Sequence, residues 1–498
     1  MRLLAFTASI LACAVLAAGC NGDESSGGAL ESSLAYVPPN TPFAVAIDTD
    51  VEGDQYQSLD EVIGRFPSGD SLGRMLQDQI EQGAGGVSYE DDVRPLLGNP
   101  FVVSATDPAS FIDESEDEDF VAAIQVADTD ALDELIAKTE AREDGEVAGA
   151  TVFEDDGTVF AVEDEMVVFA GTRELLEDAL ERADGDDHLD VDTFERSLEG
   201  LPEQALARIY VELQSLLEQE PGGEAARQVQ WIAALRTLGM TASATDDAVE
   251  VEFNLRTDGG ELSDEDLPLA SGDEAAQVVR IPGEVGFGLR DPSQVIAFFE
   301  STFQTLDPAG YGEYETGKRA ISQRFDIDVE EDLFGQLTGD LSVSAAVNGE
   351  FGVRAEVEDP EAFGRTVERV AQALPQLGAG LGVTDIAPRG DLFEARLADG
   401  GRFVFGVADG VFVAGSNAAR ARAMASQQPE DVSGANGSLV VSADAEQVAL
   451  QVLRQVAPEL GLGGIFGGGL FARPLDELNG SVATSADGMR GSFSLTVD

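Results

Sequence analysis

One stretch of the sequence has the spacing of a hydrolase nucleophile. Residues 69–73 (GDSLG) fit the G-x-S-x-G pattern, whose glycines permit a strained turn between a strand and a helix. Here the pattern follows a predicted helix and Pro67 rather than a buried strand, and Asp70 or Ser71 is well suited to cap the next helix. The general base would have to be His188, the one histidine of the chain, which lies in an acidic turn. The sequence therefore favours a helix cap, and no catalytic residue is predicted.

Two acidic runs could supply oxygen ligands to a metal ion. The first covers residues 113–119, and the second consists of Asp184, Asp186, Asp187, Asp190 and Asp192. Carboxylates suit Ca²⁺, but neither run has the central glycine and the terminal glutamate of an EF-hand. We therefore predict no specific metal site and only weak binding of divalent cations. No pair of carboxylates stands out as a glycosidase pair, because acidic residues occur throughout the chain.

Two glycine-rich stretches are candidates for ligand-binding loops. Residues 378–382 follow a helix rather than a strand, so they are not a dinucleotide fingerprint, and no cofactor is predicted. Residues 460–471 (LGLGGIFGGGLF) combine loop flexibility with large apolar side chains. They fit a mobile apolar lip over a pocket or an insertion into lipid, while the favoured alternative is a buried connection that fills the core. The candidate lip residues are Leu460, Leu462, Ile465, Phe466, Leu470 and Phe471.

The N-terminal residues have the pattern of an export signal. A basic end precedes an apolar run, residues 3–16, that is too short to span a bilayer permanently. Residues 16–20 (LAAGC) resemble the bacterial lipobox, in which the cysteine receives diacylglycerol, although Ala17 stands where that motif prefers leucine. The alternative is ordinary cleavage, which releases the protein. We expect residues 1–19 to be a lipoprotein signal peptide, and residues 20–34 to be the lipidated Cys20 and a flexible Gly/Ser-rich tether.

Composition limits both the location and the partners of the chain. Cys13 lies in the signal, so with Cys20 lipidated no disulfide or cysteine-based metal site is expected. A total of 29 Lys and Arg against 95 Asp and Glu gives a formal charge of -66, which argues against nucleic-acid binding. No later run is long and apolar enough to be a transmembrane helix. The lipid on Cys20 would then be the firm attachment to the outer face of a bacterial cell membrane.

The sequence contains one pattern twice. Residues 157–180 return as residues 401–424, each as strand, tight turn, strand and helix, with a one-residue shortening at the middle turn. Further correspondences occur in the same order. They join residues 97–101 to 337–341, 126–132 to 357–363, and 245–255 to 485–495. These recurrences predict an α+β protein made of two copies of a duplicated module, each a mostly antiparallel sheet with helices packed on it.

The module boundaries follow from composition. We expect the first module at residues 35–258, a polar linker without periodicity at 259–277, and the second module at 278–498. In the first module, Trp231, Leu235 and Leu238 form a helical stripe that Gly239 would end. In the second, a helix that begins near Phe363 would end at Pro375.

Several of these features occur together in one known family. The lipobox, the polar tether, the Pro-rich entry at residues 36–40 into an apolar strand, and the repeated strand and helix units resemble a group of bacterial, largely actinobacterial, secreted proteins. That group is known as domain of unknown function 3352. The resemblance would cover nearly all of the mature chain and implies an exported lipoprotein. It carries over no catalytic residue.

Two classes of function follow from the sequence. The first is a non-enzymatic, lipid-anchored envelope protein that binds an apolar molecule such as a lipid, binds an envelope protein, or has a structural role. The alternative is a carboxylate-dependent envelope hydrolase. A structure distinguishes the two, because a carrier needs a large apolar cavity, whereas a hydrolase needs facing carboxylates in a cleft with perturbed pKa values.

Overall fold

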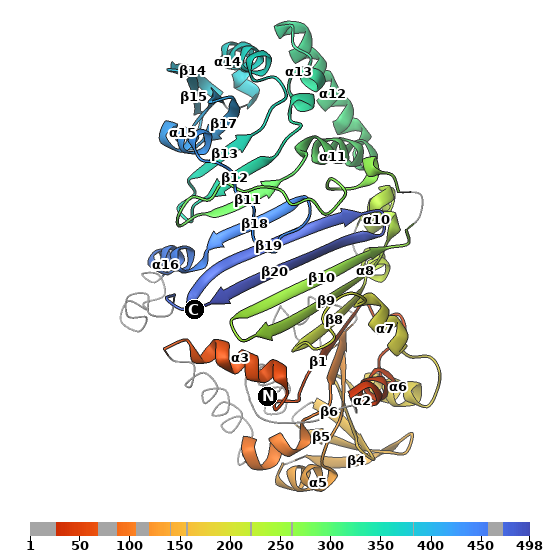
Figure 1. Ribbon diagram of the computed structural model, residues 1–498. Coiled ribbons are helices and arrows are strands. Elements are labelled where there is room, and N and C mark those ends of the chain that lie inside the picture. The colour runs from red at the N-terminus through yellow and green to blue at the C-terminus, as the bar shows by residue number, and fades with distance from the viewer. Residues whose placement is uncertain are drawn as a thin grey trace. The chain divides into compact units, whose positions relative to one another are not determined.

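The chain folds into two compact units (Figure 1). A computed structural model describes residues 26–67, 87–105, 119–139, 141–155, 158–219, 222–259, 262–381, 383–456 and 472–498. The first unit comprises residues 1–221, 235–256 and 497–498, and the second comprises residues 222–234 and 257–496. Among the described residues, no helix has the length and apolar character needed to cross a membrane.

An antiparallel sheet organises the first unit. Its strands follow the order β4-β5-β6-β7-β3-β2-β1-β8-β9, and β9 also pairs with β10. The strands are β1 (Phe43–Ile47), β2 (Phe101–Ala105), β3 (Phe120–Gln125), β4 (Arg142–Val147), β5 (Ala150–Asp155), β6 (Thr158–Glu163), β7 (Met166–Ala170), β8 (Ala207–Glu212), β9 (Leu235–Thr245) and β10 (Ala248–Thr257).

The helices of the first unit start at the residues that the capping rules favour. Asp128 caps α5 by accepting a hydrogen bond from the Ala131 amide, and Thr172 caps α6 through the Leu175 amide. Both helices therefore begin at a residue whose side chain caps the first turn. The helices are α2 (Ser26–Leu34), α3 (Asp54–Gly64), α5 (Thr129–Lys138), α6 (Arg173–Ala183), α7 (Val191–Ser197) and α8 (Leu213–Gln219).

The central strands of the first unit are covered on both faces. Every residue of β2 is buried. One face, with Phe101 and Val103, packs against Val87, Tyr89 and further apolar side chains. The other face of these strands packs against α2 and against the chain around α7. Both faces of this part of the sheet therefore contribute to the hydrophobic core.

The expected flexible tether is wrong in its second half. Residues 26–34 form α2, in which Leu30 and Leu34 are fully buried. The sequence SGGALESSL gives a weak helix signal because two glycines open it and few apolar residues follow. Burial against the sheet supplies the stability that the isolated segment lacks.

A second antiparallel sheet organises the second unit. Its order is β14-β15-β16-β17-β13-β12-β11-β18-β19, and β19 also pairs with β20. The predicted combination of antiparallel strands with helices is confirmed. The strands are β11 (Val285–Leu289), β12 (Leu341–Ala345), β13 (Phe351–Ala355), β14 (Val383–Arg389), β15 (Leu392–Leu397), β16 (Arg402–Ala408), β17 (Val411–Gly415), β18 (Leu439–Asp444), β19 (Leu475–Ser485) and β20 (Gly488–Val497).

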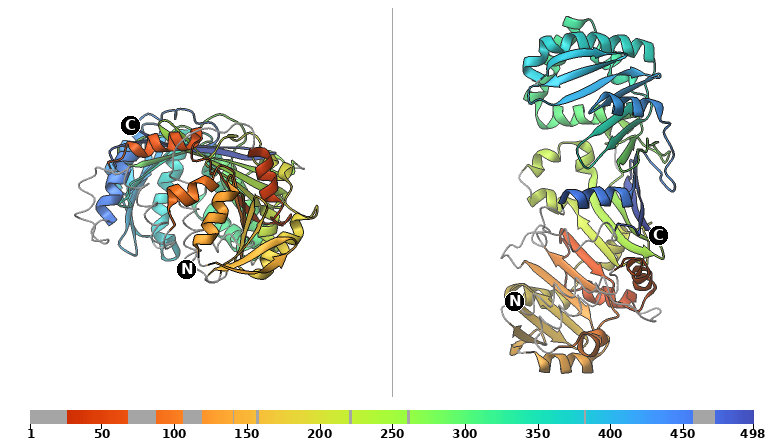
Figure 2. Two further views of the ribbon diagram at one scale, coloured as in Figure 1. Left: turned by 90° about the horizontal axis from the view of Figure 1, so that it is seen from below. Right: turned by 90° about the vertical axis from the view of Figure 1, so that its left-hand side faces the viewer.

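Helices cover parts of this second sheet. α14 packs through Phe363 and Val367 on the face formed by Phe405, Phe412 and their neighbours (Figures 1 and 2). α15 packs on the opposite face, where Met424 lies against Gly352. The helices are α9 (Gly223–Ala226), α10 (Gln230–Ala234), α11 (Pro292–Leu306), α12 (Pro308–Phe325), α13 (Val329–Asp332), α14 (Pro360–Leu381), α15 (Ala418–Ser426) and α16 (Ala445–Val456).

The two hairpins of the recurring pattern have turns of equal length. Glu163 pairs with Met166, and Ala408 pairs with Val411, so each turn has two residues. In both turns the first residue is an aspartate at positive φ, Asp164 at 50° and Asp409 at 52°. The one-residue shortening expected at this turn is therefore wrong, because a tight hairpin fixes its own length.

Two helix boundaries also differ from the expectations. α14 continues to Leu381, past Pro375, since a proline removes one hydrogen bond without ending every helix. Trp231 lies in α10 and is buried, but Leu235 begins strand β9 rather than continuing the helix. Gly239 is a strand residue. A Cβ there would lie 2.1 Å from the carbonyl oxygen of Ser197, so the close approach requires glycine.

The segment expected to be a linker, residues 259–277, belongs to the second unit. Leu267 and Ala276 within it are buried, and Ser271 bridges to Thr484 of β19. A short 3₁₀ helix, Asp264–Asp266, is closed by a capping box from Ser263. The segment is thus packed on the unit that follows it.

The position of α2 in the core can be tested by truncating one side chain. Leu30→Ala should lower the free energy of unfolding by about 2 to 5 kcal/mol, because a fully buried leucine is removed from the packed interior. Glu31→Ala, on the exposed side of the same helix, is the matched control and should change little. Urea denaturation measures both. Equal stability of the Leu30→Ala variant and the native chain would mean that residues 26–34 are a tether.

Candidate functional site

The central strands of the second unit bury their small and polar residues. In β11, Gly286 and Gly288 are buried, whereas Phe287 between them is 40% exposed. In β12, Ser342 and Ser344 are buried, whereas Val343 is half-buried. Because side chains alternate between the faces of a strand, one face is polar and covered and the other is apolar and incompletely covered.

Residues 276–284 cover the polar face and satisfy its hydroxyl groups. The amide of Val279 donates to Ser342 Oγ at 2.8 Å, and the Ser344 hydroxyl donates to the buried carboxylate of Glu284. A Cβ on Gly288 would lie 2.5 Å from the carbonyl oxygen of Gln277. The glycine therefore permits this segment to lie directly on the strand.

The opposite face is apolar across four neighbouring strands. Phe287 stands opposite both Val343 and Val441, and Val343 stands opposite Val353. Residues directly opposite one another in an antiparallel pair lie on the same face. We call this surface the apolar face; it consists of Val285, Phe287, Leu289, Leu341, Val343, Phe351, Val353, Leu439 and Val441. Each of these side chains is half-buried or exposed, and none is fully buried.

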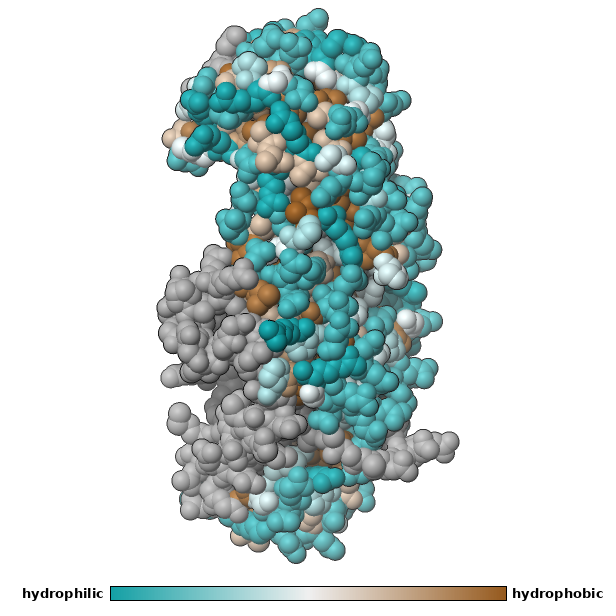
Figure 3. Space-filling view, turned by 60° about the vertical axis from the view of Figure 1, so that its left-hand side comes forward, coloured by the Kyte–Doolittle hydropathy of each residue, from teal (hydrophilic) through white to brown (hydrophobic). Residues whose placement is uncertain are grey.

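Exposed apolar side chains are concentrated in the second unit. Among the described residues, the large hydrophobic side chains that are exposed all belong to it; they are Phe287, Phe299, Leu306, Val452 and Phe493. Figure 3 shows apolar surface in patches between larger hydrophilic areas. Exposed patches of this kind mark binding surfaces more often than scattered single residues do.

Helices α11, α12 and α13 lie on the same side of the sheet as the apolar face. Val353 stands opposite Ala414, which packs beneath α14, so the apolar face is the face that α14 partly covers. α12 and α13 both contact α14. The three helices therefore extend the cover that α14 begins, and leave the strands between them half-exposed.

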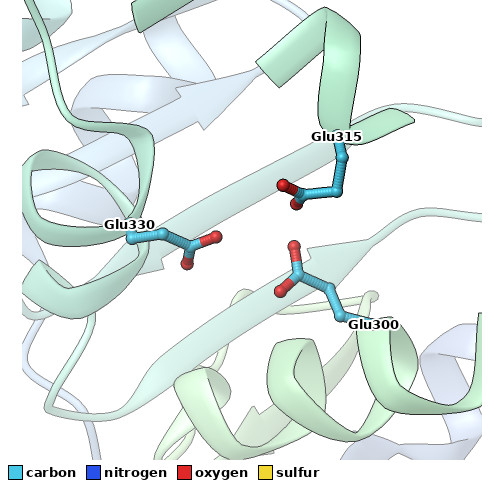
Figure 4. Close-up of side chains that lie close together, drawn as sticks. All are labelled: Glu300, Glu315 and Glu330. Carbon is cyan, nitrogen blue, oxygen red and sulfur yellow. The ribbon is translucent and has the colours of Figure 1, made fainter. Parts of the chain in front are cut away.

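A lysine and three glutamates join these three helices, and Figure 4 shows the three glutamates. Glu300 projects from α11, Glu315 from α12 and Glu330 from α13, and their carboxylate oxygens lie within 4.8 Å of one another. Lys318 of α12 forms ion pairs with all three, at 3.1 Å to Glu300, at 2.6 Å to Glu315 and also with Glu330. The Tyr314 hydroxyl donates to Glu300 at 2.6 Å. We call this group the lysine cluster.

The surroundings of the lysine cluster raise the pKa values of Lys318 and Tyr314. Burial disfavours the charged form of Lys318, but hydrogen bonds to the three carboxylates outweigh burial and raise its pKa above the ordinary value. Burial and the hydrogen bond to Glu300 raise the pKa of Tyr314 to about 12. Both groups are therefore protonated at neutral pH.

The chemistry open to the lysine cluster is limited by Lys318. The ammonium group, with a side chain only 11% exposed, stands where a cation shared by the three carboxylates would bind. A divalent ion would have to displace it. The Oε1 atom of Glu300 accepts hydrogen bonds from both Tyr314 and Lys318. The arrangement is that of an ion-pair network joining three helices.

Each unit also carries a pocket lined by polar groups. In the second unit a pocket of about 250 Å³ lies beside Arg280, whose guanidinium binds Glu477 at 3.0 Å and the Ser442 hydroxyl. In the first unit a wider pocket of about 680 Å³ is bordered by Tyr36 and Glu163, with the Tyr36 hydroxyl 3.5 Å from the Glu163 carboxylate. Charged side chains border both pockets, among them Arg280 and Glu284 in the second unit and Glu163 and Glu165 in the first.

Most of the predicted site residues lie outside the described residues. These are Cys20, Ser71, residues 113–118 and the whole lip from Leu460 to Phe471. His188 is described and half-buried, with its Nδ1 atom 3.3 Å from the carbonyl oxygen of Leu189. The acidic residues at positions 184, 186, 187, 190 and 192 are exposed. In the part of the chain that the structure describes, the carboxylates that do gather are those of the lysine cluster.

Sequence reasoning missed the lysine cluster, although one signal was available. The chain contains two lysines, Lys138 and Lys318, and both form ion pairs with carboxylates that are largely withdrawn from water. The partner of Lys138 is Asp92, whose side chain is 4% exposed. In so acidic a chain, each rare lysine marked a place where acidic groups need a counter-ion.

Comparison with known proteins identifies a family but no activity. The family described as "Protein of unknown function (DUF3352)" matches residues 2–362. No curated protein matches the chain.

Among solved structures, crystal form III of TP0453 is 9% identical, with a TM-score of 0.26, covering 46% of this chain and 82% of that one. Crystal form I of TP0453 is 13% identical, with a TM-score of 0.27, covering 46% and 81%. Similarity at this level says nothing about function.

The environment of Tyr314 predicts a late titration. The pKa of about 12 means that folding favours the neutral phenol, so its contribution to stability is complete below about pH 10 and is lost as the pH rises to about 12. We expect the absorbance at 295 nm of the native chain minus that of Tyr314→Phe to titrate with a midpoint near pH 12. The same difference in urea should titrate near pH 10. A midpoint near 10 in the folded chain would show that Tyr314 is not hydrogen-bonded to Glu300.

Proposed function

The chain belongs to the DUF3352 family, and we propose that it is a non-enzymatic, lipid-anchored protein of the bacterial cell envelope that binds an apolar ligand. The ligand is a lipid or a molecule with a similar hydrocarbon part, and it binds on the apolar face of the second unit. An exported, lipid-anchored protein of this kind would match the actinobacterial secreted lipoproteins that the sequence resembles.

The apolar face is the observation that carries the proposal. Phe287, Val343 and Val441 lie side by side on β11, β12 and β18, where most sheets of this kind would be sealed by a packed helix. Covering apolar surface stabilises a complex by roughly 25 cal/mol per Å², so a hydrocarbon chain laid on these strands gains what the protein itself leaves unburied. Hydrocarbon is favoured over a polar ligand because the face is built from valine, leucine and phenylalanine.

The contrast between the two units supports a binding role. The first unit covers both faces of its central strands, with Phe101 and Val103 fully buried. The second covers one face and leaves the other half-exposed. Because the first unit covers the corresponding face of its sheet, the fold does not require this face to be exposed. We therefore attribute the exposed apolar face of the second unit to function.

We further propose that the two units are copies of one duplicated module, at residues 35–258 and 278–498. The two strand orders agree pairing by pairing. The sequence correspondences also map the partners Val102 and Ala123 of the first unit onto Ser342 and Arg354, which are partners in β12 and β13. Each edge hairpin, β4–β5 and β14–β15, has a shift in register.

The location in the proposal rests on the N-terminal residues. An apolar segment followed by LAAGC at residues 16–20 fits export and the attachment of lipid to Cys20. The large excess of acidic residues suits a surface that does not bind nucleic acid.

The ligand can be found by native mass spectrometry. The chain from residue 21, which lacks the lipidated cysteine, is incubated with vesicles of phosphatidylglycerol and phosphatidylethanolamine and then weighed. We expect one lipid per chain, and at least a tenfold loss of occupancy in Phe287→Asp, because a carboxylate is placed among apolar side chains. Val452→Asp is the matched control, since Val452 is equally exposed at 41% but lies on α16. Replacing Phe466, Leu470 and Phe471 with serine tests the predicted lip in the same assay.

Two outcomes would contradict the lipid proposal. A native chain that stays free of lipid after this incubation does not bind lipid at the apolar face. Equal occupancy in Phe287→Asp and the native chain would place the bound lipid elsewhere. An envelope protein as the partner would then be the better interpretation.

Lipidation has its own test. Cys20→Ser should lose all incorporation of labelled palmitate and move from the membrane fraction to the soluble fraction, because Cys20 is the proposed acceptor of the lipid. Cys13→Ser is the matched control, as it changes the other cysteine and should keep both label and location. Label retained by Cys20→Ser would disprove lipidation at this residue.

A further inference from the structure

Helices α11 and α12 form a hairpin with very little burial. Pro292 is the one buried residue of α11, and α12 has none. A single residue, Asp307, joins them, and its carboxylate caps α12 through the amide of Gly310 at 2.9 Å. Few buried contacts place this hairpin at the low end of local stability in the unit.

The side chains inside the hairpin hold its two helices to each other. The Phe303 ring contacts the Tyr311 ring edge-on at 5.9 Å and the Tyr314 ring at 6.1 Å. Lys318 lies over the Tyr314 ring at 5.1 Å and binds Glu300 across the hairpin. The two helices are therefore joined along their lengths and would move together.

The hairpin is attached to the rest of the unit at its base. At the start of α11, the Gln294 side chain donates to the carbonyl oxygens of Asp264 and Leu267, at 2.6 and 2.7 Å. At the end of α12, Arg369 of α14 donates to the carbonyl oxygen of Asp326. Between these ends, Lys318 binds Glu330 of α13. That ion pair ties the middle of the hairpin to its neighbour.

We propose that Lys318 is a latch that holds the α11–α12 hairpin in place beside the apolar face, and that breaking its ion pairs lets the hairpin move away and admits the ligand. The role of the latch in ligand entry rests on the proposed function. Its mechanical part, the hold of Lys318 on the hairpin, rests only on the contacts among α11, α12 and α13.

The charges of the lysine cluster determine what happens to the hairpin when Lys318 is removed. With Lys318 in place, three carboxylates face one ammonium group at short range. Without it, three negative charges within 4.8 Å of one another repel across α11, α12 and α13. Removing the lysine therefore both breaks the tie and pushes the helices apart, whereas neutralising the glutamates as well removes the repulsion.

Hydrogen–deuterium exchange tests the mechanical part. In the chain from residue 21, we expect Lys318→Met to speed amide exchange across residues 292–325 about tenfold or more, as a shift toward the open state requires. The combined variant with Glu300→Gln and Glu330→Gln should recover part of this change. Lys138→Met is the matched control: it removes the other lysine, in the first unit, and should leave residues 292–325 unchanged.

Stopped-flow binding of cis-parinaric acid, a fluorescent fatty acid, tests the link to the ligand. We expect the association rate to rise about tenfold in Lys318→Met and to stay unchanged in Lys138→Met, because a larger open fraction binds faster. If Lys318→Met fails to fold, Glu330→Gln takes its place, since that side chain is half exposed and its loss breaks only the tie to α13.

The exchange experiment and the binding experiment can each contradict a different part of the proposal. Unchanged exchange across residues 292–325 in the variant used would overturn the latch, whatever the ligand. Faster exchange with an unchanged association rate would overturn its role in ligand entry. A native chain that does not bind cis-parinaric acid would count against the proposed apolar site, while the exchange result would still decide whether Lys318 holds the hairpin.

Discussion

The close approach of residues 276–284 to the central strands is the constraint on which the second unit depends. The segment lies so near β11 that a Cβ at Gly288 would overlap the carbonyl oxygen of Gln277. Small and hydroxylated residues must therefore occupy that face, and the Ser342 hydroxyl satisfies a backbone amide of the segment. Because side chains in a strand alternate with a period of two, this choice sends Phe287 and Val343 to the other face. The covered polar face and the apolar face therefore both follow from the same strand register.

Charge sets a second constraint on the whole chain. With 95 acidic residues against 29 basic ones, carboxylates cannot all remain in water at a distance from one another. The buried Glu284 is neutralised by Arg420, the buried Asp92 by Lys138, and the three glutamates of the lysine cluster share Lys318. A buried carboxylate without such a partner would be costly, so each scarce cation stabilises a particular contact between elements. Arginine and lysine serve here as internal counter-ions as much as surface charges.

Local patterns predicted the elements well, whereas contacts between distant residues were beyond them. The apolar runs at β1 and β2 and the cap at Thr172 follow from rules that act over a few residues. Such rules do not find α2, because its stability comes from burial, and they end α14 too early, because Pro375 does not stop this helix. The position of Lys318 had a signal in the rarity of lysine, but its partners had none, since Glu300, Glu315 and Glu330 come from three helices and meet only in the folded chain.

The burial of α2 would also limit how far a chain lipidated at Cys20 can stand from a membrane. Five residues, 21–25, separate Cys20 from Ser26, the first residue of α2, and the six Cα–Cα steps between them span about 20 Å when the chain is fully extended. If Cys20 carries the lipid, the first unit is therefore held close to the lipid headgroups. Acidic side chains repel anionic headgroups, so a short anchor and a repulsive surface would act against each other. The unit would then be kept near the bilayer without lying flat on it.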